Sequence, residues 1–257
     1  MIKIGLDTES LHLWFQNKRM DIFGFIEKAH ELGFDGVMIN ILKDYNLDPE
    51  WGTLESNDPE HLKKVRELLE SYHMYVELAT KGITREHLLK VLDVAEALGA
   101  DIIRTYIPIT LNPLASRTTG GEGKYDQAKV RGDFDPVVFD EAAMTLCQII
   151  PELKKRRIRL ALENHEYETS EELVQVMKKL NTPWIGLHYD FGNSMMAWED
   201  PAQAARNMAP YTITTHFKDH IVIPYPDDPY GYVVCGIPVG KGNMDLKHLL
   251  QIILDNS

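Results

Sequence analysis

The stretch "LALENHEYETSEELVQVMKKLNTPWIGLHYDFGN", from Leu160 to Asn193, contains the unit that decides the fold. Its first residues form an apolar run that predicts a buried strand, and Trp184–Asn193 predicts a second strand. Thr169–Asn181, which lies between them, predicts a helix. A strand, a helix and a strand in this order indicate a parallel βαβ unit. Both strands end in charged residues, and that charge needs an explanation.

The same alternation of strands and helices runs along most of the chain. Besides the two strands of the quoted stretch, we expect five more, at Ile2–Thr8, Gly36–Asn40, Tyr75–Thr80, Asp101–Ile109 and Tyr211–His220. We expect further helices at Asp21–Gly33, Asp58–His73, Thr84–Gly99, 136–157, Glu199–Ala209 and Asp245–Ser257. A long polar loop is expected at Thr110–Asp135. This regular spacing predicts an α/β protein with a parallel sheet.

The number of strands favours an eightfold (β/α)8 TIM barrel over a doubly wound sheet, which usually has about five or six strands. The chain also has no glycine-rich dinucleotide fingerprint after its first strand and no P-loop. A barrel needs one strand more than the seven we expect. Either one element is misread or the eighth strand is missing from the chain, which stops within the apolar helix "LLQIIL". We therefore predict a single TIM-barrel domain over residues 1–257, with truncation at the C-terminus as one of the two explanations for the missing strand.

Composition and charge narrow the function classes. The chain has 257 residues, of which 44% are hydrophobic and 26% charged, as in an ordinary soluble globular protein. No apolar run reaches the ~18–20 residues of a membrane helix, and no signal peptide precedes the first strand. Two cysteines, Cys147 and Cys235, fit a reducing compartment. These features predict a cytoplasmic protein. The net charge of −12 argues against a nucleic acid or a membrane as partner.

Three strand ends carry residues that can bind a metal ion. Asp190 follows Glu163 by 27 positions, and His216 follows Asp190 by 26. Each gap equals one strand–helix repeat, so the three residues should lie at the same height on one rim of the barrel, where catalytic groups project. Two carboxylates and one imidazole suit Mn²⁺ first, with Mg²⁺ or Co²⁺ as alternatives. Helix capping or simple surface charge is the competing interpretation for each residue alone.

The motifs "LALENH", "GLHYDFGN", "THFKDH" and "PVGKGNMDL", in this order, resemble the xylose isomerase-like TIM barrels. More narrowly, they resemble the sugar phosphate isomerase/epimerase group, which shares its fold with class-two AP endonucleases. The resemblance covers most of the chain. It implies a sugar substrate and one metal ion held by Glu, Asp, His and a second Glu, of which Glu163, Asp190 and His216 match the first three. The second Glu would come from the eighth strand, which this sequence does not contain.

The resemblance and the residues together assign catalytic roles. Glu163 would act as acid or base as well as metal ligand. His165 could be a second acid/base group, or a strand histidine satisfied by the backbone. Lys218 could neutralise an oxyanion or a carboxylate, or simply pair with Asp219.

Four residues are candidates for binding the substrate. Asn193 occupies the position where ketose 3-epimerases of this family carry a substrate-contacting His, and it could bind a hydroxyl or cap the turn. Arg104 could contact the substrate or pair with Glu77. His12 and Trp14 could form an apolar wall against which a sugar lies, or could pack in the core or against a partner.

The function that these residues predict is a divalent-metal-dependent isomerase or epimerase of a sugar or keto-sugar. It would remove a proton next to a carbonyl and stabilise the enediolate that results. The alternative is a lyase of the same fold: a dehydratase, a decarboxylase or an enzyme that cleaves 3-oxo-glycosides. Asn193 favours this alternative slightly, and together with the net charge it disfavours DNA repair. A non-enzymatic barrel subunit stays open, as does a homo-oligomer or a partner subunit.

Overall fold

The structure, a computed structural model, describes residues 2–41, 47–48, 50–108, 137–165, 167–197, 199–225 and 231–256. The polar loop expected at 110–135 lies outside these residues. The contacts within the chain divide it into two compact units. The first unit consists of Met1–Tyr106 and Gln148–Leu160, and the second of Ile107–Cys147 and Ala161–Ser257. The prediction of one barrel domain over the whole chain stays a prediction.

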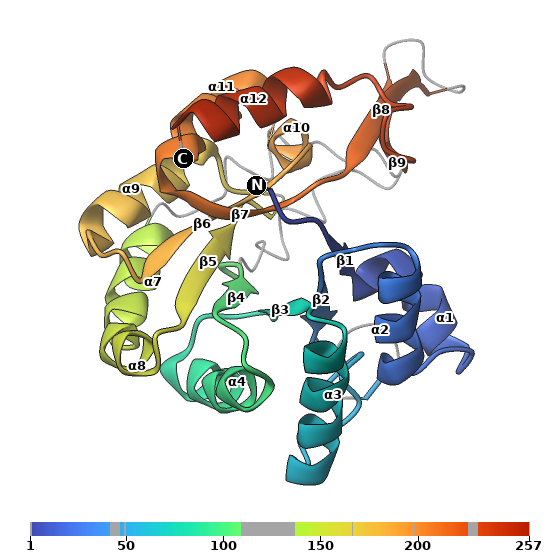
Figure 1. The fold of residues 1–257 in the computed structure, drawn as a ribbon. Coiled ribbons are helices and arrows are strands. Elements are labelled where there is room, and N and C mark those ends of the chain that lie inside the picture. Colours follow the sequence, from blue (N-terminus) through green and yellow to red (C-terminus); the bar gives the residue numbers. More distant parts are fainter. Residues whose placement is uncertain are drawn as a thin grey trace, which may run out of the picture. The chain divides into compact units, whose positions relative to one another are not determined.

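The first unit contains four parallel strands in chain order, each followed by a helical segment or a loop (Figure 1). Its strands are β1 (Gly5–Asp7), β2 (Gly36–Asn40), β3 (Tyr75–Ala79) and β4 (Ile102–Thr105). Its helices are η1 (Thr8–Leu11), α1 (His12–Gln16), α2 (Ile22–Glu31), α3 (Pro59–Ser71), α4 (Arg85–Leu98) and α8 (Ile150–Arg156). Apolar residues of β2, β3 and β4 such as Ile39, Leu78 and Ile103 are fully buried. Continuous burial of this kind is typical of parallel strands covered by helices.

The second unit contains three parallel strands and a separate antiparallel hairpin (Figure 1). Its parallel strands are β5 (Arg159–Glu163, whose last three residues belong to this unit), β6 (Ile185–Asp190) and β7 (Thr212–His216). Its hairpin consists of β8 (Asp219–Pro224) and β9 (Tyr232–Ile237). Its helices are α7 (Val137–Cys147), α9 (Ser170–Leu180), α10 (Asn193–Met196), α11 (Pro201–Met208), η2 (Ala209–Tyr211) and α12 (Leu246–Asn256). Helices α7, α9, α11 and α12 pack in that order, each against the next.

Helix starts follow the capping signals of the sequence. Asp58 accepts hydrogen bonds from the first turn of α3, and Pro59 occupies the first helical position. Thr169 and Glu172 form a reciprocal capping box at the start of α9. No helix in the described part of the chain is long and apolar enough to cross a membrane.

Two local predictions were wrong. The single helix expected at 136–157 is two helices, because Pro151 starts the new helix α8 after α7 has ended at Cys147. The strand expected at Tyr211–His220 ends at His216, and the next residues form β8, whose hairpin partner β9 was expected to be loop. The run of aromatic and β-branched residues in β9 is the signal that could have revealed this hairpin.

Candidate functional site

The ends of β5, β6 and β7 bring the predicted metal ligands together in the second unit. In the β6–β7 register, Asp190 is paired directly with His216, so the two residues lie at the same height, as their spacing predicts. Glu163, the last residue of β5, and Asp190, the last of β6, are each 1% exposed. His216 is about four-fifths buried. Burying two carboxylates at adjacent strand ends is costly unless cations or strong donors lie beside them.

Asp190 is the centre of this cluster. Its Oδ2 atom accepts a hydrogen bond from Asn193 Nδ2 at 2.9 Å and lies 3.0 Å from Lys218 Nζ and 3.4 Å from His216 Nδ1. Its other oxygen, Oδ1, is buried and has no hydrogen-bond partner among the described residues. Oδ2 of Asp190 therefore has three donor groups beside it, while Oδ1 is available for a further ligand.

The charges around Asp190 keep it ionised. Burial by itself raises the pKa of this carboxyl, but the charges of His216 and Lys218 lower the pKa by more. The pKa of Asp190 therefore lies well below its usual range. Lys218 thus pairs with the predicted metal ligand, whereas the Oδ2 atom of Asp219 accepts hydrogen bonds from the backbone N–H groups of Gly240 and Gly242.

Asn193 connects the two carboxylates. It is 5% exposed and begins the short helix α10 directly after Gly192. Its Nδ2 group donates to Asp190 Oδ2 at 2.9 Å and to Glu163 Oε1 at 3.4 Å. The side chain of Asn193 is therefore directed at the predicted ligands and makes no side-chain cap for α10.

Asn164 is a site residue that the sequence analysis missed. Its side-chain Nδ2 donates to the backbone oxygen of Asp190 at 3.2 Å, and its Oδ1 accepts from the backbone N–H of Asp190 at 2.7 Å. This pair of bonds extends the β5–β6 contact by one residue and fixes the backbone of Asp190. The signal in the sequence was the amide directly after Glu163, in a run that is otherwise charged.

The donor types in this cluster fit a divalent metal ion. Two buried carboxylates and an imidazole are ligands that hard or borderline divalent cations accept, and Asp190 Oδ1 is a buried oxygen that no described residue hydrogen-bonds. The side chains are not closed around one point, since no three His, Cys, Asp or Glu residues in the described part form a set that could hold a metal. Lys218 and Asn193 instead occupy the Oδ2 side of Asp190.

The other predicted site residues are distributed between the two units. His165 follows β5 in the second unit and is half-buried. His12, Trp14 and Arg104 belong to the first unit. His12 Nδ1 is hydrogen-bonded to the backbone oxygen of Glu9 at 2.7 Å, and Trp14 is 51% exposed. Arg104 is buried at the end of β4. Their roles in substrate binding stay predictions.

The first unit has a polar cluster of its own at the ends of β1 and β2. Asn40 Nδ2 donates to Asp7 Oδ1 at 2.5 Å and to Thr8 Oγ1 at 3.1 Å. Thr53 Oγ1 donates to the backbone oxygen of Asn40 at 2.8 Å. All four residues are buried. This network, in which hydroxyl and amide groups surround one carboxylate, was not predicted from the sequence.

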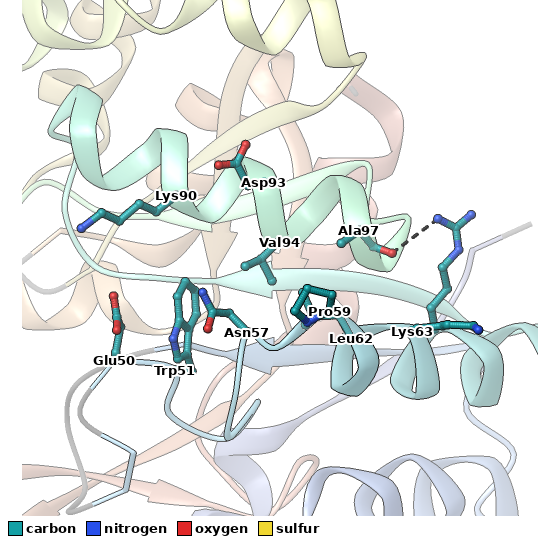
Figure 2. A pocket seen from close by; sticks show the side chains of 11 residues that line it. Glu50, Trp51, Asn57, Pro59, Leu62, Lys63, Lys90, Asp93, Val94 and Ala97 are labelled. Atoms are coloured by element: carbon teal, nitrogen blue, oxygen red, sulfur yellow. Dashed lines mark hydrogen bonds between the residues drawn. The ribbon is translucent and has the colours of Figure 1, made fainter.

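A cavity of about 660 Å³ lies in the first unit, between α4 and the segment that leads into α3 (Figure 2). Trp51 and Asn57 line it on one side, with Lys90 and Asp93 on the other. Arg66 donates to the backbone oxygen of Ala97 at 3.4 Å across its end. The cavity contains none of the predicted site residues, and its charged side chains are mostly exposed, so we do not assign the chemistry to it.

The family of the chain follows from its sequence as a whole. Residues 26–257 match the model of the xylose isomerase-like TIM barrel, a range that includes most of the first unit, the whole second unit and the strand ends that carry Glu163, Asp190 and His216. The chain belongs to this family. The predicted barrel fold is thereby confirmed.

Individual relatives of this family are sugar-modifying enzymes. The 3-oxo-isoapionate decarboxylase of Pectobacterium atrosepticum is 26% identical over 98% of this chain and 81% of its own length. Among solved structures, the 3-keto-D-glucoside 4-epimerase YcjR of E. coli superposes with a TM-score of 0.64 at 13% identity, covering 100% of this chain and 88% of that one. The IolI protein, solved with a bound zinc atom, gives a TM-score of 0.66 at 14% identity, covering 100% and 86%.

Proposed function

We propose that this chain is a divalent-metal-dependent enzyme that acts on a keto-sugar at the carbon next to its carbonyl group. The observation that carries the proposal is the convergence of Glu163, Asp190 and His216 at three consecutive strand ends, where one oxygen of Asp190 is buried and has no hydrogen bond with the described residues. These three residues would hold the metal, with Mn²⁺ as first candidate. The bound cation would supply the positive charge that stabilises an enolate oxygen.

The side chains of the site have separate tasks in this proposal. Glu163, buried at the end of β5, removes or returns a proton at the carbon beside the carbonyl. Lys218, whose ammonium group lies at Asp190, adds a second positive charge next to the developing oxyanion. Asn193 holds the two carboxylates in a fixed relation. His165, which follows Glu163 by two positions, is the further acid/base candidate.

Two outcomes can follow from the same enolate. Returning the proton to another carbon or another face gives an isomerase or epimerase, the reaction that the sequence resemblance puts first. Losing carbon dioxide from a 3-oxo acid gives a decarboxylase, a lyase reaction. One relative, 26% identical over 98% of this chain, is named a decarboxylase, and this observation favours the lyase as second candidate. Decarboxylation also needs no base for its first step, because the enolate forms as the carbon–carbon bond breaks.

Metal dependence is tested by removing and restoring the metal. We expect the purified protein to contain a divalent metal, to lose activity after dialysis against a chelator and to recover it best with Mn²⁺. The Asp190→Asn variant should bind less metal than the wild-type protein in the same assay, because one ligand has lost its charge. Full activity in a metal-free sample would contradict the proposal.

The reaction is tested by NMR in D₂O with a panel of ketoses and 3-oxo sugar acids. Deuterium incorporated beside the carbonyl of an otherwise intact sugar would identify an isomerase or epimerase. Release of carbon dioxide, with deuterium on the carbon that carried it, would identify the decarboxylase. If the metal-loaded protein converts no member of the panel, the proposed substrate class is wrong.

A further inference from the structure

His220, in β8 of the second unit, is a side chain that the mechanism above does not use. Its backbone is held from both sides. Its N–H donates to Asp219 Oδ1 at 2.9 Å, and its carbonyl oxygen accepts from the backbone N–H of Asn243 at 2.8 Å. The imidazole ring, by contrast, makes no hydrogen bond with the described residues, although its Nδ1 atom is buried. A buried ring nitrogen without a partner needs an explanation.

The ring lies against Gly192, between Asp190 and Asn193 in the sequence. Gly192 has a φ angle of 90°, a left-handed conformation that favours glycine. A methyl group built on Gly192 would overlap Nδ1 of His220. The absence of a side chain at this position therefore lets the imidazole approach the turn that carries two residues of the site.

This contact determines which nitrogen carries the proton. Nδ1 faces Gly192 and has no acceptor there, so the proton of the neutral ring belongs on Nε2. Burial lowers the pKa of His220, and the charge of Lys218 lowers the pKa further. The ring is therefore neutral near pH 7. Nε2 is neither buried nor hydrogen-bonded among the described residues, so His220 carries an N–H donor that can bind a ligand.

We propose that His220 is a substrate-contacting residue of this site, whose Nε2–H donates a hydrogen bond to an oxygen atom of the keto-sugar, with Gly192 making room for the ring. The inference rests on the proposed function, because it takes the keto-sugar as ligand. A neutral N–H donor suits the hydroxyl and carbonyl oxygens that a sugar carries on every carbon. His220 would thus contribute to substrate specificity. A ligand that lacks the matching oxygen atom would leave the Nε2–H group without a partner and would bind more weakly.

The test is NMR of the imidazole nitrogens in histidine-labelled full-length protein with Mg²⁺, which does not broaden the signals. The probes are D-fructose and 2-keto-D-gluconate, a neutral and an acidic keto-sugar. We expect His220 to show a protonated Nε2 and an unprotonated Nδ1 before addition. On addition, Nε2 should shift and Nδ1 should move little. His248, an exposed histidine on α12 of the same unit, is the control and should not move.

Three results would overturn the inference. If His216 shifts on addition of a probe and His220 does not, the sugar binds without touching His220, and the proposed function is unaffected. If neither histidine responds to either probe, binding of keto-sugars itself fails and the inference falls with it. A proton on Nδ1 in the free protein would also contradict the argument.

Variants give a second readout with any keto-sugar that the wild-type protein converts. The amide nitrogen of Gln can reach the place of Nε2, whereas that of Asn corresponds to Nδ1. We therefore expect the KM of His220→Gln to stay near the wild-type value, and that of His220→Asn and His220→Ala to rise about tenfold. The His248→Ala variant should be unchanged. Equal losses in His220→Gln and His220→Asn, with unchanged melting temperatures, would contradict a role for Nε2.

Discussion

Two buried polar clusters lie at strand ends of this protein, one in each unit, and they differ in charge and in hydrogen bonding. In the first unit, Asp7, Thr8, Asn40 and Thr53 form a network with one formal charge, held together by hydroxyl and amide donors. In the second unit, the Asp190 cluster combines two carboxylates with a lysine and a histidine.

This difference suggests different roles for the two clusters: the first supports the fold, and the second binds a ligand. In the first network, neutral donors bind Oδ1 of Asp7: the side-chain amide of Asn40 and the backbone N–H of Glu9. The second keeps an ionised Asp190 with one oxygen unpaired, a state that is unfavourable unless a ligand completes it. A buried cluster that contains several charged side chains is therefore the better indicator of function here.

The largest effect should come from removing the central charge of the second cluster. We expect Asp190→Asn to lower kcat/KM by about 10³-fold or more, because it weakens metal binding and unbalances Lys218 and His216. The matched change in the first cluster, Asn40→Ala, should lower kcat/KM less than tenfold relative to wild type. Steady-state kinetics on the same keto-sugar checks both variants. Similar losses in the two would abolish the distinction between the clusters.

A smaller effect is expected at Asn164, which holds the backbone of Asp190. Asn164→Ala should reduce metal affinity by about 10–100-fold, as is usual for groups that orient a ligand. It should also lower the free energy of unfolding by roughly 1–3 kcal/mol, since the backbone N–H and oxygen of Asp190 lose their partner. Titration calorimetry with Mn²⁺ and denaturant unfolding measure the two effects. Weaker folding with unchanged metal affinity would make Asn164 purely structural.

The first cluster should respond in stability alone. Thr53→Val removes the hydroxyl that donates to the backbone oxygen of Asn40, and it should cost roughly 1–3 kcal/mol of unfolding free energy. We expect kcat/KM to stay within about twofold of wild type, because no charge changes. Circular dichroism and tryptophan fluorescence should both follow the unfolding, since the two units need not unfold together. A large loss of activity in the folded variant would show that this cluster contributes to the function and not to stability alone.

The smallest effect concerns pH dependence in the first unit. Burial raises the pKa of Tyr75, and the charges of Glu77 and Asp35 raise the pKa further. The unfolded chain then loses this proton at a lower pH than the folded one, near the ordinary value of about 10. The stability that results is fully present below pH ~10 and is lost as pH rises above it. Tyr75→Phe should therefore lose less stability than wild type in alkaline unfolding experiments, and parallel curves would contradict the assignment.

Much of the fold could be predicted because its signals are local. The helix α3 follows from Asp58 and Pro59, and α9 follows from its capping box. The spacing of Asp190 and His216 predicted their shared height, and the strand register pairs them. The hairpin of β8 and β9 was missed because its partner strand was read as part of a loop rich in proline, glycine and tyrosine.

The sequence by itself determined which residues end the strands, and therefore which chemical groups the rim of the second unit contains. Only the tertiary structure decided the partners of these groups. Lys218 pairs with Asp190 on another strand although Asp219 is its neighbour in the chain, and Asn164 binds the backbone of a residue 26 positions away. The reason is that periodicity depends on neighbours along the chain, whereas a hydrogen bond between strands depends on packing to within a fraction of an ångström, which no local pattern encodes.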